Sequence, residues 1–367
     1  MPSKIEESAA GLSPEFNVTP KTKVDVGILG ATGTVGQQFI ALLEGHPWFR
    51  TAWLAASERS AGKRYGDLPW RLPVAAPEDA ARLSVEALKP GTGPKLVFSA
   101  LDSSVAGEAE AAFAAAGHTV ISNSRNHRMD PLVPLLIPEI NAEHLGLLPA
   151  QRKTEGRSGA IITNSNCSTM FLAIALGALR KFQPKRVLVT TLQALSGAGY
   201  PGVASLDATA NVIPFIDGEE EKMETETRKI LGEFRGGAIV PHPMTISATT
   251  TRVPVINGHT EAVSVEFEKT VSREEILEAF KNFTGVPQEL RLPSAPPKPI
   301  IYLDAPNRPQ PRLDVERDGG MVVHIGRLRT CPVLGYKFVI LGHNTIRGAA
   351  GAAILNAELM AAKNLLA

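Results

Sequence analysis

Cysteine is scarce in this sequence: of 367 residues only Cys167 and Cys331 carry a thiol, which excludes a disulfide framework as the basis of the fold. The eight histidines form neither a His-Glu-x-x-His motif nor a Cys/His ligand spacing, so we expect no zinc site and no bound metal. No apolar run approaches the roughly 20 residues that a membrane helix needs. The fold must therefore rest on a hydrophobic core.

Neither sign of charge is in excess. The sequence has 38 basic and 37 acidic residues and a net charge of +1, which removes the electrostatic case for nucleic acid or a membrane surface as the main partner. Hydrophobic residues make up 44% and charged residues 20%, as in soluble globular proteins. Because the chain is about twice the ~150 residues of a common domain, we expect two domains that share a cleft.

The N-terminal segment lacks the apolar stretch of a secretory signal peptide. Residues 1–20 mix glutamate, serine and proline instead, so we expect a flexible tail and a cytoplasmic protein.

The first half of the chain alternates apolar strands with helical runs, the rhythm of a doubly wound parallel sheet. We expect strands at Val24–Leu29, Ala52–Ala56, Leu96–Ala100 and Thr119–Ser122, and helices at Gln37–Leu43, Glu78–Ala87 and Gly107–Ala116.

Longer β-branched stretches replace this rhythm in the second half and indicate a mixed or antiparallel sheet. We expect strands at Arg186–Gln193, Ile246–Val253, Glu261–Glu268 and Met321–Arg329, and helices at Gly218–Leu231 and Ser272–Phe280. The proline-rich stretch Leu290–Pro311 is predicted to be a surface connection. Arg347–Leu366 has helical spacing and is expected to pack on the first domain.

The fold class predicted is α/β: a Rossmann-type dinucleotide-binding domain at residues 21–160 and an α+β catalytic and dimerisation domain with a mixed sheet at residues 161–345. Residues 346–367 would form a C-terminal helix that returns to the first domain.

A glycine-rich turn follows the first expected strand, in the string Val-Asp-Val-Gly-Ile-Leu-Gly-Ala-Thr-Gly-Thr-Val-Gly that ends at Gly36. Glycines at 27, 30, 33 and 36 allow a tight turn and a close approach of backbone N–H groups to a pyrophosphate at a helix start. The motif favours a dinucleotide, although such a turn alone also suits other ligands.

The end of the second strand bears on which dinucleotide binds. An NAD-selective fold usually has a carboxylate there for the ribose hydroxyls. Ser57, Arg59 and Ser60 instead offer donors to a 2′-phosphate and favour NADP. Glu58 lies among them, and a merely solvated polar loop is the alternative.

Cys167 lies between a β-like run and an apolar helical run, within Ser-Asn-Cys-Ser-Thr. A thiol at a helix N-terminus is favoured as the nucleophilic thiolate. A free cysteine is more often a small buried hydrophobe. The polar residues around Cys167 are poor core residues, however, and together with the glycine-rich turn they suggest aldehyde oxidation through a thioester.

His259 is a candidate acid or base, because histidine titrates close to neutral pH. It follows the strand Ile246–Val253 and we expect it on a turn that faces a cleft, with a solvated turn histidine as the alternative. Arg252 near that strand's end can hold a carboxylate bidentately, although an arginine there is also commonplace.

Two further segments are less specific. Glu219, Glu220 and Glu221 open an expected helix, where stabilisation by the helix dipole is a sufficient explanation. The glycine-rich run that begins at Gln193 is either an ordinary loop or one that lies against nicotinamide and substrate.

Four motifs in order carry a family resemblance: Gly-Ala-Thr-Gly-Thr-Val-Gly at 30–36, Ser-Asn-Cys-Ser-Thr at 165–169, Gln-Ala-Leu-Ser-Gly-Ala-Gly at 193–199 and Arg-Val-Pro-Val-Ile-Asn-Gly-His at 252–259. From about residue 23 onward the chain resembles the fungal and archaeal branch of the aspartate-semialdehyde dehydrogenases. The resemblance implies a glyceraldehyde-3-phosphate-dehydrogenase-like fold. It also implies NADPH-dependent reduction of aspartyl phosphate to aspartate semialdehyde, on the route to lysine, threonine, methionine and isoleucine.

The same resemblance implies roles for individual residues. It makes Cys167 the nucleophile, His259 the acid/base and Gln193 the residue that orients the thioester. The implied substrate-binding residues are Arg128 and Lys222 for phosphate with Asn123 nearby, Glu219 for the amino group, and Arg252 for the carboxylate. The implied NADP(H)-binding residues are Gly30, Thr32, Gly33, Thr34, Val35, Ser57, Arg59, Ser60, Ser99, Ser196, Gly197 and Asn344. The choice of Glu219 among three consecutive glutamates rests on its spacing from Lys222.

The partners implied are small molecules: aspartate semialdehyde, aspartyl phosphate and inorganic phosphate. The resemblance also implies a homodimer or homotetramer formed through the second domain. Two alternatives keep the fold: a reductase that resembles malonyl-CoA reductase and takes a CoA thioester, and a non-catalytic NADP-binding sensor with a degraded site.

Overall fold

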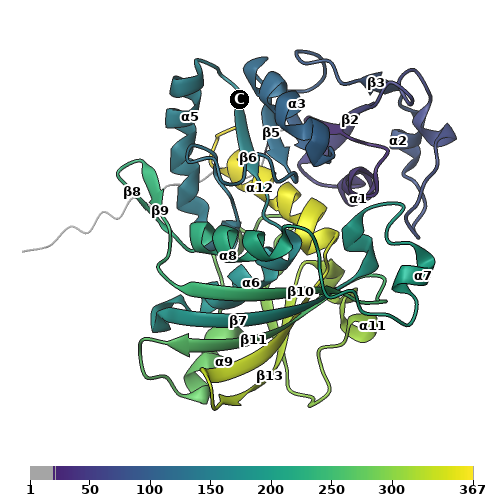
Figure 1. Cartoon of the computed structure of the whole chain (residues 1–367). Coiled ribbons are helices and arrows are strands. Elements are labelled where there is room, and N and C mark those ends of the chain that lie inside the picture. The colour runs from purple at the N-terminus through teal and green to yellow at the C-terminus, as the bar shows by residue number, and fades with distance from the viewer. Residues whose placement is uncertain (1–19, 21, 367) are drawn as a thin grey trace, which may run out of the picture.

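The computed structural model describes residue 20 and residues 22–366, so the tail predicted at residues 1–20 lies outside the described range except for Pro20. Two six-stranded sheets form the body of the protein, one parallel and one mixed. Figure 1 shows the parallel sheet in the upper half, the mixed sheet in the lower half, and the C-terminal helix α12 (Gly351–Ala362) between them. The α/β fold class is confirmed.

The parallel sheet has the strand order β3-β2-β1-β4-β5-β6. Its strands are β1 (Val24–Leu29), β2 (Phe49–Ala56), β3 (Val85–Ala87), β4 (Leu96–Ser99), β5 (Thr119–Ser122) and β6 (Ala160–Thr163). β4, β5 and β6 are buried along their whole length, as the apolar runs of a sheet covered on both faces require. The domain boundary expected after residue 160 falls inside β6, which continues this sheet.

Short helices connect these strands. They are α1 (Thr34–Leu43), η1 (Tyr65–Asp67), α2 (Glu78–Arg82), α3 (Ser103–Ala115), α4 (Pro138–Asn141), η2 (Ala142–Leu147) and α5 (Leu148–Glu155). The helix expected over Glu78–Ala87 is wrong in its last residues. The chain leaves the helix at Leu83, and the β-branched Val85 pairs with Leu54 as the start of edge strand β3.

The mixed sheet has the order β10-β7-β11-β14-β13-β12. Its strands are β7 (Pro184–Gln193), β10 (Thr245–Arg252), β11 (His259–Phe267), β12 (Ile300–Leu303), β13 (Val323–Cys331) and β14 (Gly335–Gly342). Buried and exposed residues alternate along β7 and β10, so one face is covered. Helices α6 (Cys167–Ala178), α8 (Glu219–Ile230) and α9 (Arg273–Lys281) contribute residues to the core on that face.

The proline-rich stretch Leu290–Pro311 is not only a surface connection. Ile300–Leu303 forms strand β12, which pairs with β13 at the edge of the mixed sheet, and Leu292 is buried. The prolines of the segment lie before and after β12, which contains none, so none of them interrupts the pairing of this edge strand.

The C-terminal segment begins with a π-helical turn, η6 (Ile346–Ala350), and continues as α12. Ile354, Leu355 and Leu359 of α12 lie in one hydrophobic cluster with Val26 of β1 and Phe39 of α1. The end of the chain therefore packs on the parallel sheet, and it brings η6 against the start of α6.

The remaining elements are short. They are η3 (Arg180–Phe182), η4 (Leu195–Ala198), α7 (Ser205–Ala208), β8 (Glu233–Arg235), β9 (Ala238–Val240), α10 (Val286–Glu289), α11 (Pro311–Asp314) and η5 (Arg317–Gly320). Within the described residues, no helix combines the length and the apolar character that crossing a membrane would demand.

Candidate active site

Cys167 is the first residue of α6, so the prediction that places it at a helix N-terminus is confirmed. Asn166 caps this helix: its side-chain oxygen accepts a hydrogen bond from the backbone N–H of Thr169 over 3.0 Å. Strand β6 ends at Thr163, three residues before the cap, so the thiol lies at the carboxyl edge of the parallel sheet, where open α/β sheets bind ligands.

A cavity of about 550 Å³ opens in front of Cys167, between the carboxyl edge of the parallel sheet and the mixed sheet. The predicted site residues that line it are Val35, Asn123, Arg128, Cys167, Ser196, Gly197, Glu219, Lys222, Arg252 and Asn344. They come from segments more than 300 residues apart in the chain. The fold therefore gathers the predicted nucleophile and all five predicted substrate-binding residues around one space.

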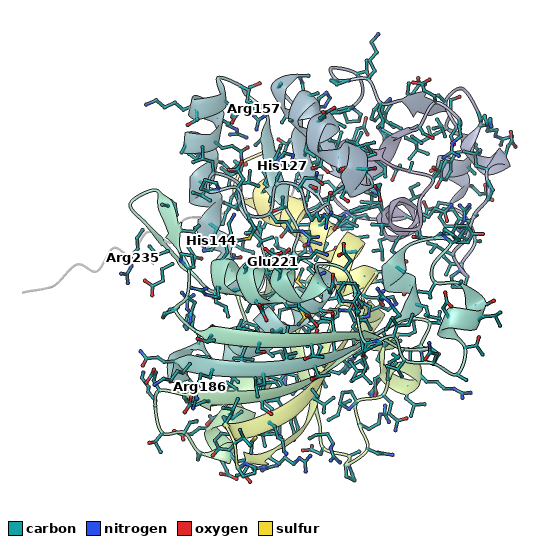
Figure 2. The ribbon with its side chains drawn as sticks, viewed as in Figure 1. His127, His144, Arg157, Arg186, Glu221 and Arg235 are labelled. Atoms are coloured by element: carbon teal, nitrogen blue, oxygen red, sulfur yellow. The ribbon has the colours of Figure 1, made fainter. Side chains whose placement is uncertain are left out.

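The three consecutive glutamates of α8 have different surroundings. Glu219 is buried at the cavity, where its carboxylate accepts from the Asn166 side chain over 2.6 Å and pairs with Lys222 at 3.0 Å. Glu220 accepts from the backbone N–H of Thr250 on edge strand β10. Glu221 lies on the exposed side of α8 (Figure 2). Only Glu219 of the three lines the cavity.

Glu226, two helical turns after Glu219, joins the two loops that form the cavity wall. One of its carboxylate oxygens accepts from Arg128 at 3.0 Å, and the other accepts from the backbone N–H of Asn166 at 2.8 Å. Arg128 also donates to the carbonyl of Asn123 at 2.7 Å. Glu226 therefore fixes Arg128 relative to the helix that carries Cys167.

Lys229, one turn further along α8, extends this anchoring. Its ammonium group donates to the backbone carbonyls of Arg128, Asp130 and Val133 over 2.7 to 3.0 Å. Sequence reasoning missed Glu226 and Lys229. The spacings of seven and ten residues from Glu219 place all three on one helix face, and this periodicity was the available signal.

His259 is not on a turn, which corrects that expectation. It is the first residue of β11, pairs with Gly342 of β14 and is fully buried. The turn ends one residue earlier, at Gly258, whose positive φ of 95° reverses the chain before the strand begins. The imidazole lies behind the cavity wall at Gly197: a Cβ added there would come within 3.0 Å of its Nε2 atom.

Ala194 connects two predicted site residues. Its backbone N–H donates to Nδ1 of His259 at 2.9 Å, and its carbonyl accepts from the Arg252 guanidinium at 2.7 Å. Nε2 of His259 has no hydrogen-bond partner among the residues that the structure describes. His259 does not itself line the cavity, because Gly197 lies between the imidazole and that space.

Gln193 ends β7 and is also buried. Its amide nitrogen lies 3.3 Å from the Glu219 carboxylate and 3.3 Å from the Thr191 hydroxyl. Gly348 of η6 meets Cys167 from the other side, since a Cβ at that position would lie 2.7 Å from the Cβ of Cys167. Close packing of the C-terminal segment on the nucleophile thus requires glycine there, which the sequence pattern did not reveal.

The charges around Cys167 act in opposite directions. Burial and the Glu219 carboxylate raise the pKa of the Cys167 thiol to about 12, while Arg128 and Arg252 lower it. The helix N-terminus favours a thiolate, but burial and the Glu219 carboxylate outweigh it, contrary to the expectation that the thiolate is the favoured form. Burial raises the pKa of Glu219, but Lys222 and hydrogen bonds from Asn166 and Lys222 outweigh it and bring the pKa below its ordinary value.

The glycine-rich turn has the shape that a dinucleotide requires. Gly30 has a φ of 79°, and a Cβ there would lie 2.6 Å from the carbonyl oxygen of Ala100. At Gly36, a Cβ would overlap the carbonyl of Gly30. Helix α1 starts directly after this turn, with Gly33 as its N-cap and no acidic residue in its first turn. Its N-terminal N–H groups are therefore a fitting site for a pyrophosphate.

The other predicted cofactor-binding residues lie in three places. Ser57 and Arg59 are exposed just beyond the end of β2, and Ser60 donates its backbone N–H to the carbonyl of Ser57 at 2.8 Å. Ser99 ends β4 and is fully buried. Asn344 donates to the Ser196 hydroxyl at 2.8 Å, beside the cavity.

Thr32 lies in the glycine-rich turn, and Thr34 is the first residue of α1. The carbonyl of Thr32 accepts a hydrogen bond from Arg71 at 3.4 Å. The guanidinium of Arg71 in turn lies 4.1 Å from the centre of the Tyr200 ring, so it links the turn to the loop after η4.

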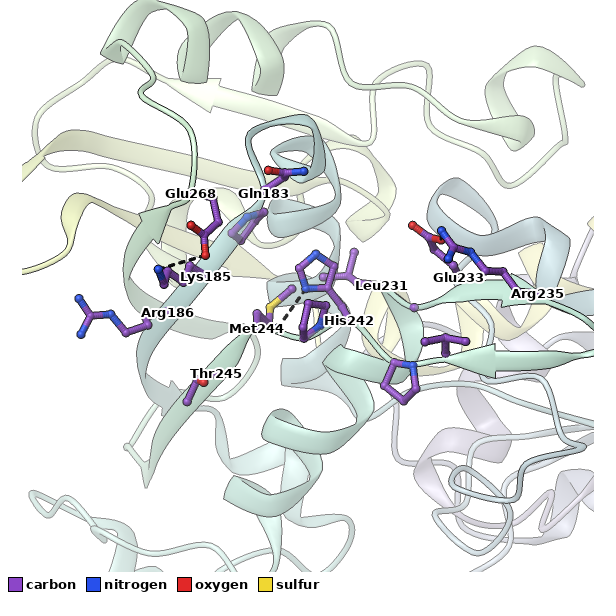
Figure 3. A pocket seen from close by; sticks show the side chains of 15 residues that line it. Gln183, Lys185, Arg186, Leu231, Glu233, Arg235, His242, Met244, Thr245 and Glu268 are labelled. Carbon is purple, nitrogen blue, oxygen red and sulfur yellow. Dashed lines mark hydrogen bonds and ion pairs between the residues drawn. The ribbon is translucent and has the colours of Figure 1, made fainter.

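A second cavity of about 690 Å³ lies at the opposite end of the mixed sheet, between the starts of β7 and β10 and the β8–β9 hairpin (Figure 3). Lys185 and Glu268 form an ion pair at its rim, at 3.1 Å, and Met244 donates its backbone N–H to His242. None of the predicted site residues lines it.

Comparisons with known proteins agree with this geometry. The family model for the semialdehyde dehydrogenase NAD-binding domain matches residues 25–148, and the model for the semialdehyde dehydrogenase dimerisation domain matches residues 176–347. The chain is 49% identical to aspartate-semialdehyde dehydrogenase from Archaeoglobus fulgidus over 346 residues, covering 94% of this chain and 100% of the relative. The Cryptococcus neoformans enzyme is 47% identical over 364 residues, with 95% and 100% covered.

Among solved structures, the crystal structure of aspartate semialdehyde dehydrogenase with NADP from Candida albicans superposes with a TM-score of 0.87 at 42% identity. The match covers 94% of this chain and 100% of that one. On this evidence the chain belongs to the aspartate-semialdehyde dehydrogenase family.

Proposed function

We propose that this protein is an NADP-dependent aspartate-semialdehyde dehydrogenase that reduces L-aspartyl 4-phosphate to L-aspartate 4-semialdehyde through a thioester on Cys167. This is the step that leads toward lysine, threonine, methionine and isoleucine. The observation that supports it best is the cavity itself, in which a thiol at a helix start faces Arg128, Lys222, Arg252 and Glu219. Three cationic side chains and one carboxylate match a substrate that has a phosphate, a carboxylate and an ammonium group.

Each charged side chain has a natural partner on the substrate. Arg252 is fixed by the Ala194 carbonyl and presents its remaining N–H groups to the substrate carboxylate. Glu219 accepts the ammonium group, and Arg128 and Lys222 bind the phosphate, with Asn123 beside them. The ammonium group also neutralises Glu219, which removes an anion that disfavours the thiolate of Cys167.

The covalent step uses Cys167. Its thiolate attacks the acyl carbon, the bond from that carbon to the phosphate oxygen breaks, and inorganic phosphate leaves toward Arg128 and Lys222. Gln193 and the N–H groups at the start of α6 orient the thioester carbonyl. Once the thioester carbon has received a hydride, the Nε2–H group of His259 donates a hydrogen bond to the resulting oxyanion. Collapse of this oxyanion to the aldehyde breaks the carbon–sulfur bond and releases the thiolate of Cys167.

The cofactor is NADP(H). When bound, it supplies the hydride that the thioester carbonyl carbon receives. Gly30, Gly33, Thr34 and Val35 would hold its pyrophosphate at the start of α1, and Ser57, Arg59 and Ser60 would hold the 2′-phosphate. We place Thr32, Ser99, Ser196, Gly197 and Asn344 along the remainder of the same cofactor.

We also propose that the protein works in the cytoplasm as a homodimer or homotetramer. The match of residues 176–347 to a dimerisation domain supports an assembly of identical subunits.

The direct test follows NADPH absorbance with purified protein, NADP and aspartate semialdehyde, with and without inorganic phosphate. Phosphate-dependent NADPH formation that disappears in Cys167→Ser is the expected result. Binding of NADP by Cys167→Ser, measured by calorimetry, shows that the variant is folded.

Parallel assays separate the alternatives. Turnover with malonyl-CoA and NADPH, but none with phosphate, would reassign the protein to the CoA-dependent reductases. Binding of NADP without turnover in any assay would favour the sensor.

A further inference from the structure

Asn164 follows the last residue of β6 and precedes Cys167 by three residues. Its side chain is fully buried and is not among those that line the cavity. Its backbone N–H donates to the carbonyl of Ser122 at 2.7 Å, so its main chain is attached to the end of β5. The residue lies directly behind the wall of the cavity, yet the proposed mechanism assigns it no role.

The carboxamide nitrogen of Asn164 joins two other segments of the chain. It donates to the backbone carbonyl of Ala349 in η6 at 2.8 Å and to the side-chain oxygen of Asn123 at 2.9 Å. Its two N–H groups are thereby used. The side-chain oxygen of Asn164, in contrast, is buried without a hydrogen-bond partner in the described part of the chain. Because an unpaired buried acceptor is destabilising, we attribute the presence of an amide here to its two N–H groups.

The Ala349 carbonyl fixes which end of the Asn164 amide faces it. Arg347, two residues earlier in η6, forms a bidentate ion pair with Glu139 of α4, at 2.8 Å to each carboxylate oxygen, and both side chains are fully buried. The turn that carries Ala349 is therefore anchored. Since a carbonyl oxygen can only accept, the amide atom that faces it must be the nitrogen of Asn164.

The same reasoning fixes the amide of Asn123, which lines the cavity. Because Asn164 presents its nitrogen, the facing atom of Asn123 must be the oxygen. The Asn123 nitrogen lies 3.5 Å from the carbonyl of Ser99, a contact at the limit of a hydrogen bond that engages one N–H group at most. At least one N–H group of Asn123 is therefore left for a ligand.

A donor at this place suits an anion. Arg128, which donates to the backbone carbonyl of Asn123 at 2.7 Å, lines the same cavity, and so does Lys222. If the Asn123 amide were flipped, its oxygen would meet the oxygens of a phosphate group held by these cations, and neither partner could donate. The orientation of this amide thus decides whether Asn123 supports or opposes phosphate binding.

We propose that Asn164 is a positioning residue: its carboxamide sets the orientation of the Asn123 side chain, so that Asn123 donates an N–H group to the phosphate of the substrate. This role rests on the proposed function, in which Arg128 and Lys222 bind that phosphate. Asn164 itself touches no reacting atom. It acts through Asn123 and connects the phosphate-binding wall of the cavity to η6.

The first test measures the KM for inorganic phosphate in NADPH formation from aspartate semialdehyde. Asn123→Ala removes the donor, and the loss of a hydrogen bond to a charged group should raise this KM by about 10- to 100-fold. Asn164→Leu removes the bonds that orient the donor, and we expect it to raise the same KM by about fivefold or more. The KM for NADP should stay close to that of the wild type. An unchanged KM for phosphate in either variant, or a rise in the KM for NADP instead, would overturn the proposal.

Asn356→Leu is the matched control for the loss of a buried amide. Asn356 of α12 is also fully buried, its nitrogen lies 3.5 Å from the carbonyl of Leu136, and its oxygen has no partner among the described residues. It does not line the cavity. Its substitution should leave the KM for phosphate unchanged, and a rise equal to that of Asn164→Leu would contradict a specific role for Asn164. Asn164→Ala removes the same N–H groups with a smaller side chain and carries the test if Asn164→Leu does not fold.

A double-mutant cycle tests the route through Asn123. The double variant Asn123→Ala/Asn164→Leu should have the KM for phosphate of Asn123→Ala alone, because Asn164 has nothing left to orient. Losses that multiply would mean that the two residues act independently, contrary to the proposal.

A binding measurement separates this role from the proposed function. Phosphate bound in front of Cys167 should slow alkylation of the thiol by iodoacetamide, and the phosphate concentration that gives half protection reports affinity without turnover. We expect this concentration to rise by about fivefold or more in Asn164→Leu. Absence of protection in the wild type would overturn the proposal. No wild-type turnover refutes the proposed function, whereas a phosphate affinity that is insensitive to Asn164→Leu refutes only the role of Asn164.

Discussion

The backbone N–H of Ala194 donates a hydrogen bond to Nδ1 of His259 over 2.9 Å, and this contact fixes the tautomer of the imidazole. Nδ1 must carry a lone pair, so the ring proton resides on Nε2. Burial and the charge of Arg252 lower the pKa of His259 to about 3, so the free ring is neutral near pH 7. In the proposed reaction His259 would therefore act as a neutral N–H donor, comparable with the neutral histidine that polarises a carbonyl in triosephosphate isomerase.

The tautomer leads to a prediction about two amide replacements of His259. Glutamine can place an N–H group close to the position of Nε2, whereas asparagine reaches only as far as Nδ1. We expect His259→Asn to lower kcat by about 10²- to 10³-fold, as loss of an oxyanion donor does, and His259→Gln to lower it by roughly tenfold. Steady-state rates of NADPH formation with aspartate semialdehyde and phosphate measure both. Equal losses in the two variants would show that a donor at Nε2 is not what His259 contributes.

A second prediction concerns the reactivity of Cys167. The Glu219 carboxylate helps to raise the thiol pKa to about 12, so Glu219→Gln removes an anion, stabilises the thiolate and must lower that pKa. The alkylation rate follows the thiolate fraction, which near pH 7 rises tenfold for each unit by which the thiol pKa falls. Allowing for the weaker nucleophilicity of a more acidic thiol, we expect a net gain of about threefold per unit near pH 7.

Glu221→Gln is the matched control for the thiol measurement, because this glutamate lies two residues further along α8, on its exposed side. Its alkylation profile should equal that of the wild type. An unchanged profile in Glu219→Gln would contradict the assignment of Glu219 as the anion that restrains Cys167.

Local sequence patterns were sufficient for most of the fold. The expected strands at Val24–Leu29 and Thr119–Ser122 match β1 and β5, because apolar runs between turn residues carry their own signal. Two short strands at the edges of the sheets, β3 and β12, could not be predicted from the sequence. β3 lay within an expected helix and β12 within an expected connection, since three or four residues have too little periodicity to identify themselves.

The site was predicted through residue types and motif order, but its geometry depends on the tertiary fold. Cys167 could be placed at a helix start because Asn166 is a capping residue next to an apolar run. The burial of His259 could not be predicted, because it follows from the pairing of β11 with β14. The contact of Gly348 with Cys167 joins segments 181 residues apart in sequence number, and no local pattern encodes it.

A third prediction addresses how Arg128 is held. Glu226→Ala would leave the Arg128 guanidinium and the Asn166 backbone N–H without their buried acceptor. Breaking a buried pair in this way typically lowers the free energy of unfolding by about 3–5 kcal/mol. Urea denaturation measures the change. Glu78→Gln breaks an exposed ion pair with Arg82 and should cost about 0.5 kcal/mol or less, so a comparable small effect in Glu226→Ala would contradict the anchoring role.

The fourth prediction distinguishes NADP from NAD binding at the end of β2. Arg59 is exposed there and forms no ion pair with any residue in the described part of the chain, so its charge is available to a 2′-phosphate. Losing one arginine–phosphate contact of about 1.5–3 kcal/mol corresponds to a 10- to 100-fold rise in the KM for NADP in Arg59→Ala. The KM for NAD should change little, because NAD lacks that phosphate. Arg82→Ala, on α2, is the control for a general loss of positive charge. If the KM values for NADP and NAD rise together, Arg59 contacts a portion of the dinucleotide other than the 2′-phosphate. Any preference for NADP would then have to come from Ser57 and Ser60.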